Sequence, residues 1–120
     1  ERVDALCGAQ AGEVHPFLAR MISLPLDHSA RERLSGIEGE GLHVLTFRAV
    51  EMLLERAAEQ APLAVVCEDL HWADPTSLEL LEQLLPWTAR VPLLILCILR
   101  PERRHGCWRI VEAAARDYPH

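Results

Sequence analysis

The stretch that decides the fold is residues 65–81, VVCEDLHWADPTSLELL. A continuously apolar run ends here, abruptly, in the two acids Glu68 and Asp69. The run is rich in β-branched residues and does not alternate with polar ones, so it is typical of a parallel strand covered on both faces. Asp74 and Pro75 then supply a good N-cap and a suitable first helical residue, which predicts a helix directly after the acids.

A second apolar run, LLILCIL at residues 93–99, repeats the pattern of the first. Between the two runs, Leu78, Leu81 and Leu85 recur on one side of the expected helix, and Pro86 is expected to end or kink it. Strand, helix and strand at this spacing predict a βαβ unit with two parallel strands. The expected fold class is therefore α/β.

The rest of the chain adds helices to this unit. Pro16 can open a helix at its first turn, and Asp27 or Ser29 can cap a short one. The expected elements are a short strand near 2–7, a helical stretch over 13–60, a strand at 63–68, a crossover helix at 75–89, a strand at 93–100 and a C-terminal helix at 108–116. All of them are expected to form one domain, because 120 residues is the size of one domain.

Composition excludes several classes of partner. The net charge is -6 and the basic residues are spread among acids, which argues against a nucleic-acid surface. No apolar run approaches the roughly 20 residues that a membrane-spanning helix needs. The chain contains no lysine, since all 12 basic residues are arginine. It therefore cannot contain the phosphate-binding loop G-x-x-x-x-G-K-[ST].

The four cysteines are not spaced like a metal site. None of Cys7, Cys67, Cys97 and Cys107 forms a C-x-x-C pair. Cys67 and Cys97 lie inside the apolar runs, where a thiol behaves as a small hydrophobic group. We expect neither structural zinc nor a disulfide framework, and a reducing cytoplasm is the expected compartment.

Polar side chains that could do chemistry follow both expected strands. The carboxyl ends of parallel strands share one edge of a sheet, and open α/β sheets bind ligands at that edge. Glu68 and Asp69 follow the first strand, and Arg100 follows the second. One carboxylate could hold Mg²⁺ through water, the other could orient an attacking water, and the arginine could meet charge on a terminal phosphate.

Plainer interpretations compete with this one. An acid pair after a strand is often only the start of a solvated loop, and Arg100 can be a surface residue. His71 and Asp74 could join the acid pair in a metal-dependent hydrolase, but the spacing is not that of a recognised ligand set. Packing at a turn is favoured for His71 and Trp72, helix capping for Asp74, and a solvated loop for residues 103–105.

The whole string is more specific than its acid pair. PLAVVCEDLHWADPTSLELL, residues 62–81, resembles the Walker B segment of AAA-like and STAND-type signalling ATPases. PLLILCILRPE, residues 92–102, resembles the next strand of that module, which ends in a sensor arginine. Such modules occur in large bacterial proteins, beside class III adenylate or guanylate cyclase domains, in LuxR-type transcriptional regulators and with kinase domains. The resemblance implies a partial P-loop NTPase three-layer sandwich with about three parallel strands flanked by helices.

The resemblance also assigns roles by position. It implies that Glu68 is the Mg²⁺-associated Walker B acid, Asp69 the acid that polarises the attacking water, and Arg100 the sensor of the terminal phosphate. It implies ATP and Mg²⁺ as cofactors and ATPase activity in the intact protein. The order Glu-Asp departs from the commoner Asp-Asp or Asp-Glu, which makes hydrolysis less secure than nucleotide binding.

The missing lysine loop sets a further expectation. The chain resembles an internal fragment that is itself inactive, with the P-loop segment and an output domain elsewhere in the same polypeptide. The strand at 93–99 would then have an unpaired apolar edge, which predicts self-association. The rival interpretation is a non-catalytic regulatory or protein-interaction module, derived from an NTPase that lacks a P-loop.

Overall fold

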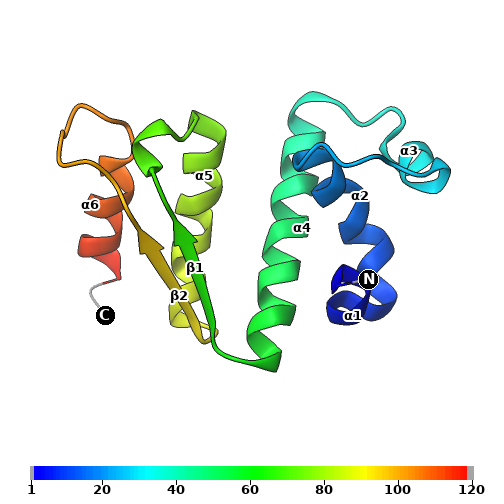
Figure 1. The fold of residues 1–120 in the computed structure, drawn as a ribbon, viewed down its shortest axis with the longest axis horizontal. Helices are drawn as coiled ribbons and strands as arrows, with labels where there is room; N and C mark the ends of the chain where they lie inside the picture. The colour runs from blue at the N-terminus through cyan, green and yellow to red at the C-terminus, as the bar shows by residue number, and fades with distance from the viewer. Residues whose placement is uncertain (1, 119–120) are drawn as a thin grey trace. The chain divides into compact units, whose positions relative to one another are not determined.

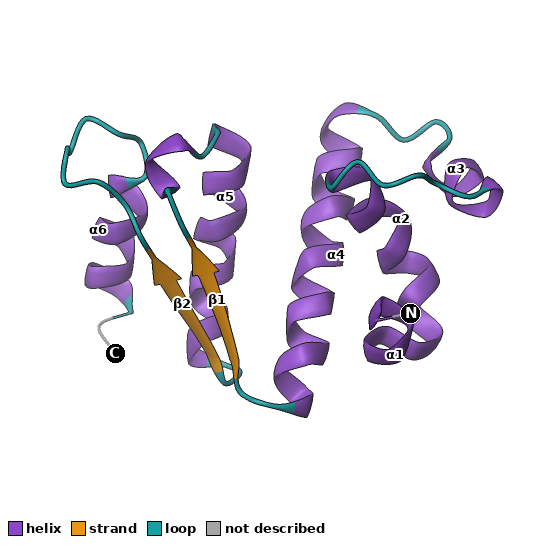
Figure 2. Cartoon of the chain, in the orientation of Figure 1, coloured by secondary structure: helices purple, strands orange, loops and turns teal. Residues whose placement is uncertain are grey.

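A computed structural model describes residues 2–118. Helices dominate, and the strands are confined to the second half of the chain (Figures 1 and 2). The chain divides into two compact units, with the boundary between Ala57 and Ala58. That both units are parts of one NTPase domain remains a proposal, so each is described by itself.

Unit 1 is helical. Its elements are α1 (Arg2–Cys7), the 3-10 turn η1 (Gly8–Gln10), α2 (Ala11–Met21), α3 (His28–Leu34) and α4 (Gly39–Gln60), whose last residues cross the unit boundary. Its core gathers around Val14, which is fully buried, with Phe17 and Leu34 close to it in the same cluster. Asp27 caps α3 as predicted, because its Oδ1 accepts a 2.7 Å hydrogen bond from the Ala30 N–H.

The prediction of a strand at residues 2–7 is wrong, because these residues form helix α1. The apolar residues Val3, Leu6 and Cys7 stand three and four positions apart, which is the spacing of one helical face. Cys7 is buried, and all three belong to the core cluster of unit 1. The segment is too short for its sequence to distinguish the helical period of 3.6 residues from the strand period of two. Burial of one helical face therefore determines its conformation.

Pro16 does not open α2 as predicted but lies inside it, since the helix begins at Ala11. A proline within a helix has no N–H to donate to the carbonyl four residues earlier, which here is that of Gly12. That carbonyl accepts a 2.8 Å hydrogen bond from Nη1 of Arg33 instead. A side chain distant in sequence thus replaces the donor that the proline removes.

Unit 2 carries the sheet. Its elements are β1 (Leu63–Cys67), the 3-10 turn η2 (Leu70–Trp72), α5 (Pro75–Leu84), the 3-10 turn η3 (Leu85–Ala89), β2 (Leu93–Cys97) and α6 (Trp108–Asp117). The two strands are parallel and pair in direct register from Leu63 with Leu93 to Cys67 with Cys97. The α/β class and the strand–helix–strand order are confirmed, but the described sheet has two strands rather than three.

The helix between the strands ends as predicted. Its α-helical part stops at Leu84 and tightens into η3, in which Pro86 lies near the start. A proline at this point cannot donate to the helical carbonyl ladder, so the regular helix cannot continue. Leu78, Leu81 and Leu85 are buried together on one side of the helix, as their spacing predicts.

Both helices of unit 2 cover the same face of the sheet. Residues of α5 and α6 form one core cluster, against which Ile95 and Cys97 of β2 pack. The prediction that the strands are covered on both faces is wrong for the described chain. The opposite face is an exposed apolar row made of Val66, Leu94, Leu96 and Ile98, and Leu94 is 62% exposed. We call this row the open sheet face.

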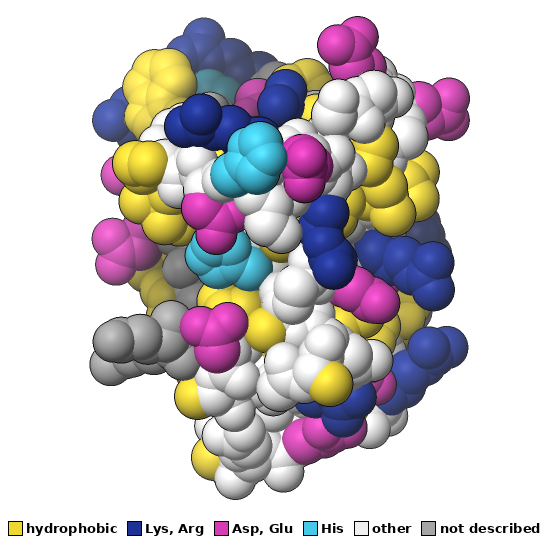
Figure 3. Space-filling model, turned by 90° about the vertical axis from the view of Figure 1, so that its right-hand side faces the viewer, with side chains coloured by type: hydrophobic (Ala, Val, Ile, Leu, Met, Phe, Trp, Pro, Cys, Tyr) yellow, Lys and Arg dark blue, Asp and Glu magenta, His cyan; other side chains and the backbone are white. Residues whose placement is uncertain are grey.

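The surface drawn in Figure 3 mixes arginine and acidic side chains, with hydrophobic side chains between them. Among the described residues, no helix has both the length and the apolar character that crossing a bilayer requires.

Candidate functional site

An irregular turn follows β1. The Ile98 N–H donates to the Cys67 carbonyl at 2.9 Å, and the Leu70 N–H donates to the Ile98 carbonyl at 3.0 Å. In a regular parallel ladder the second donor would be residue 69 rather than residue 70, because ladder bonds are evenly spaced. One extra residue has therefore been inserted at the end of β1, as in a β-bulge, and such insertions re-aim side chains next to active sites.

Asp69 is the residue that accommodates the insertion. Its φ of 52° and ψ of 35° lie in the left-handed region. Few residues other than glycine adopt this conformation, but aspartate does so several times more readily than most. The Asp69 side chain is 78% exposed, and Glu68 beside it is exposed too. Both carboxylates thus stand in solvent at the carboxyl edge of the sheet.

His71 lies beneath this turn. Its side chain is 3% exposed, and neither ring nitrogen has a hydrogen-bond partner among the described residues. Its Nε2 is 3.9 Å from Oδ1 of Asp69, which is longer than a hydrogen bond. Its ring also meets the ring of His105 edge-on, with the centroids 5.6 Å apart. His71 therefore packs at the turn as predicted, and it connects the loops that follow the two strands.

Trp72 does not pack as predicted. It is 74% exposed, although its ring centroid lies only 5.2 Å from that of His71. The 3-10 turn from Leu70 to Trp72 directs Leu70 and His71 inward and leaves the third side chain outside. An exposed tryptophan beside two exposed acids is thus part of the same surface.

Asp74 caps α5. Its Oδ1 accepts a 2.8 Å hydrogen bond from the Ser77 N–H, and Pro75 occupies the start of the helix. The same hydrogen bond lowers the pKa of the Asp74 carboxyl below its usual value. This confirms the capping interpretation. Residues 2–118 contain no group of three or more His, Cys, Asp or Glu placed to hold a metal ion, so Asp74 and His71 do not complete a metal cluster with the acids.

Arg100 lies three residues beyond Cys97, the last paired residue of β2, and is exposed. Among the described residues, the Arg100 guanidinium forms no ion pair with a carboxylate. The Glu68 carboxylate likewise accepts no hydrogen bond and forms no ion pair there. The loop beyond Arg100 is solvated as predicted, since Arg103 and Arg104 are exposed, and it also contacts the start of α6. Arg103 lies 5.3 Å over the Trp108 ring, and the Trp108 indole N–H donates to the Glu102 carbonyl at 2.9 Å.

Two thiols at this edge were not predicted to meet. Cys67 and Cys97 are paired in register at the ends of the two strands. The interaction of the two thiol groups lowers the pKa of Cys67 to about 7 and raises the pKa of Cys97. Each cysteine is the fifth residue of its strand, but their meeting also depends on the register of the two strands, which the structure supplies.

The donor set fits a hard cation better than a phosphate chain. Carboxylate oxygens, with water, are the ligands that Mg²⁺ prefers, and the two exposed acids provide them. A triphosphate needs a cradle of backbone N–H groups and cations, and the described edge offers one arginine for it. The geometry thus matches the acidic half of a nucleotide site.

Comparison with known proteins identifies the family of the chain. A family model described as an AAA ATPase domain matches residues 2–96. The chain belongs to the AAA ATPase domain family. The match includes both acids of the AAA domain and ends before Arg100. An uncharacterized protein of Rhizobium meliloti (strain 1021) is 39% identical to the AAA domain over 86 residues, which is 72% of this chain and 8% of that protein. No solved structure matches the chain.

Proposed function

We propose that this AAA domain supplies the acidic half of an ATP-hydrolysing site. Glu68 holds Mg²⁺ through water, Asp69 orients the attacking water, and Arg100 contacts the terminal phosphate. The observation that carries the proposal is the residue inserted after β1, which turns Asp69 into the left-handed region and exposes both acids. Backbone strain of this kind is concentrated at functional sites, where it fixes a side chain in advance of binding.

The exposed position of the acids suits the roles proposed for them. Mg²⁺ sheds its water reluctantly, so an acid that binds it through water needs room around it. Bound Mg²⁺ would neutralise charge on the phosphates, which is the chemistry that phosphoryl transfer requires. Within the chain, Glu68 and Asp69 would orient waters, and the guanidinium of Arg100 would act as a fixed cation.

The phosphate grip must come from a segment with a lysine loop, because this chain has no lysine. We propose that the same polypeptide supplies it and that the complete module is a STAND-type switch controlling an attached signalling output. The resemblance of residues 62–102 to such modules supports this. A cytoplasmic location is part of the same proposal.

Binding measurements test whether another segment binds the phosphates while Glu68 binds Mg²⁺. By isothermal titration calorimetry, the 120-residue chain should bind Mg-ATP at least about 100-fold more weakly than the intact polypeptide, a difference of about 2.7 kcal/mol. In the intact polypeptide, Glu68→Gln should weaken binding of Mg-ATP but not of metal-free ATP. Tight binding of Mg-ATP by the 120-residue chain would contradict the proposal that the phosphate-binding loop lies in another segment. An equal loss with and without metal would remove Glu68 as the Mg²⁺ residue.

A non-catalytic interaction module is the second candidate, favoured by the lysine-free composition. The same titration separates the two functions. If the intact polypeptide binds neither form of ATP, the domain is a module of this second kind.

The open sheet face gives the domain a second proposed partner, another copy of itself. An apolar row beside unpaired strand edges favours association. We expect light scattering to find oligomers at high concentration, and Leu94→Lys to return the chain to its monomer mass of 13.5 kDa. Leu24→Lys is the matched control, since Leu24 is similarly exposed (52%) but lies in unit 1. A monodisperse wild-type monomer would contradict this proposal.

A further inference from the structure

Cys67 and Cys97 have the arrangement of a dithiol. They are direct partners in the parallel register, and both pack against the core cluster of unit 2, so their side chains lie on the same face of the sheet. Neighbouring strands are about 4.8 Å apart. Disulfides join Cα atoms separated by about 4.4–6.8 Å, so the backbone already meets this requirement. Both thiols are free.

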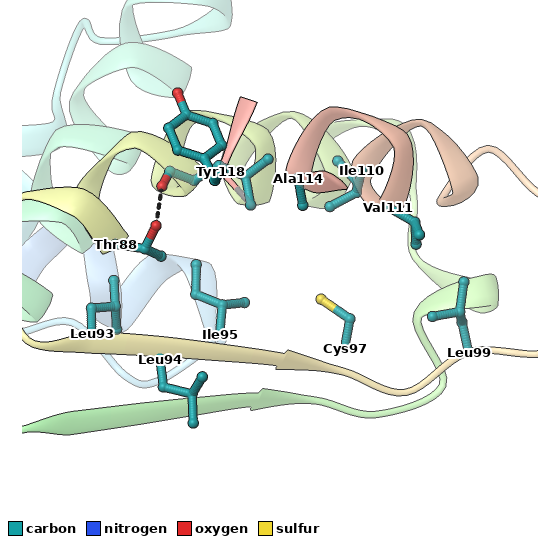
Figure 4. A pocket seen from close by; sticks show the side chains of 11 residues that line it. Thr88, Leu93, Leu94, Ile95, Cys97, Leu99, Ile110, Val111, Ala114 and Tyr118 are labelled. Atoms are coloured by element: carbon teal, nitrogen blue, oxygen red, sulfur yellow. Dashed lines mark hydrogen bonds between the residues drawn. The ribbon is translucent and has the colours of Figure 1, made fainter. Parts of the chain in front are cut away.

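A cavity gives access to Cys97, one member of the pair. It has a volume of about 500 Å³ and is lined largely by apolar side chains, including Leu99, Ile110 and Tyr118. The Cys97 side chain extends from β2 into this space, toward α6 (Figure 4). Both cysteines are only partly buried. A small uncharged oxidant can therefore reach the Cys97 sulfur through the cavity.

We propose that Cys67 and Cys97 form a reversible oxidation site, which takes a peroxide and closes to an intrachain disulfide. One thiol attacks a peroxide oxygen, so that an S–O bond forms, the O–O bond breaks and one water leaves. The second thiol attacks the resulting sulfenic sulfur, so that the S–S bond forms, the S–O bond breaks and a second water leaves. The two thiols are oxidised by two electrons in total, and hydrogen peroxide is reduced to two waters. A dithiol reductant restores the two thiols by thiol–disulfide exchange and is itself oxidised to a disulfide.

The bond would act on the turn that carries the acids. A disulfide would link the ends of β1 and β2 covalently, immediately before Glu68. The Ile98 N–H bonds the Cys67 carbonyl at that level, so the bond would restrain the start of the inserted turn. Formation of the disulfide does not require nucleotide binding. The test of the disulfide is therefore independent of the proposed function.

The other thiols are placed less favourably. Cys7 is buried in unit 1. Cys107 is 1% exposed and belongs to the same core cluster as the pair, which makes it the natural competitor for Cys97. Direct register favours Cys67 over Cys107 as the partner of Cys97.

Peptide mapping tests the proposal directly. The intact chain is treated with hydrogen peroxide, its remaining thiols are blocked with N-ethylmaleimide, and it is digested with trypsin without reduction. Cleavage after arginine, but not before Pro101, puts the cysteines on four separate peptides, namely 3–20, 57–90, 91–103 and 105–109. We expect a cross-link between 57–90 and 91–103 that dithiothreitol removes, and loss of two of the four maleimide adducts.

Variants and isotope mixing make the result specific. Cys67→Ser and Cys97→Ser should each abolish the cross-link, whereas Cys7→Ser and Cys107→Ser should leave it unchanged. Mixing ¹⁵N-labelled with unlabelled chain should give no cross-links of mixed isotope, because the bond is within one chain. A cross-link between 91–103 and 105–109, mixed-isotope cross-links, or sulfinic acid without a cross-link would each overturn the proposal. The peptide map of the wild-type chain tests the proposal even if a cysteine variant fails to fold.

Discussion

In the intact polypeptide, Asp69→Asn is expected to slow ATP hydrolysis by about 10²-fold or more while leaving ATP affinity within about 2-fold. An amide cannot accept a proton from the attacking water, so the chemical step loses its base. Binding is spared because Mg²⁺ contact is assigned to Glu68. Steady-state phosphate release and equilibrium titration of the same variant measure the two quantities separately.

The substitution is well matched to the backbone. Asparagine adopts the left-handed conformation as readily as aspartate, so the inserted turn after β1 should persist. Asp69→Val is the contrasting variant, since a β-branched residue at positive φ is strained and should disturb the turn as well as the chemistry. Unchanged turnover in Asp69→Asn would remove Asp69 from its assigned role. A matching loss of ATP affinity would make it a binding residue instead.

The second large effect is on stability. Leu81→Ala is expected to lower the free energy of unfolding of unit 2 by about 2–5 kcal/mol. Leu81 is 4% exposed in the cluster that joins α5 to α6, so truncation leaves a cavity that its neighbours cannot close. Urea unfolding followed by tryptophan fluorescence is specific here, because all three tryptophans, Trp72, Trp87 and Trp108, lie in unit 2.

Gln83→Ala is the control for that experiment. Gln83 is exposed on the same helix, and substitutions at such positions usually change stability by less than about 0.5 kcal/mol. Equal and small effects of the two substitutions would mean that α5 is not packed on the sheet as described.

The βαβ unit could be predicted because its signals are local. Two apolar runs, an Asp-Pro start and a leucine stripe each act within a few residues, and the capping of α5 by Asp74 followed from chemistry at one position. The acids were located for the same reason, since the ends of parallel strands share an edge. Their roles in binding and hydrolysis stay predictions.

The features that could not be predicted depend on a partner segment. The left-handed turn at Asp69 is apparent only against the hydrogen bonds of Ile98. The meeting of Cys67 and Cys97 needs the register of the two strands. The helix at residues 2–7 is not predictable because a six-residue segment shows too little of either the helical or the strand period. The exposure of Trp72 depends on where a single 3-10 turn directs it.

The most direct test of the central claim is to locate the metal. Fe²⁺ is bound in place of Mg²⁺ with ATP in the intact polypeptide, and ascorbate with oxygen then generates radicals that cut the backbone beside the ion. The account predicts that the ATP-dependent cuts within this chain fall at residues 68–70 and 98–100, and that Glu68→Gln removes them. Cuts confined to other segments of the chain, or cuts at the same residues that persist in Glu68→Gln, would contradict it.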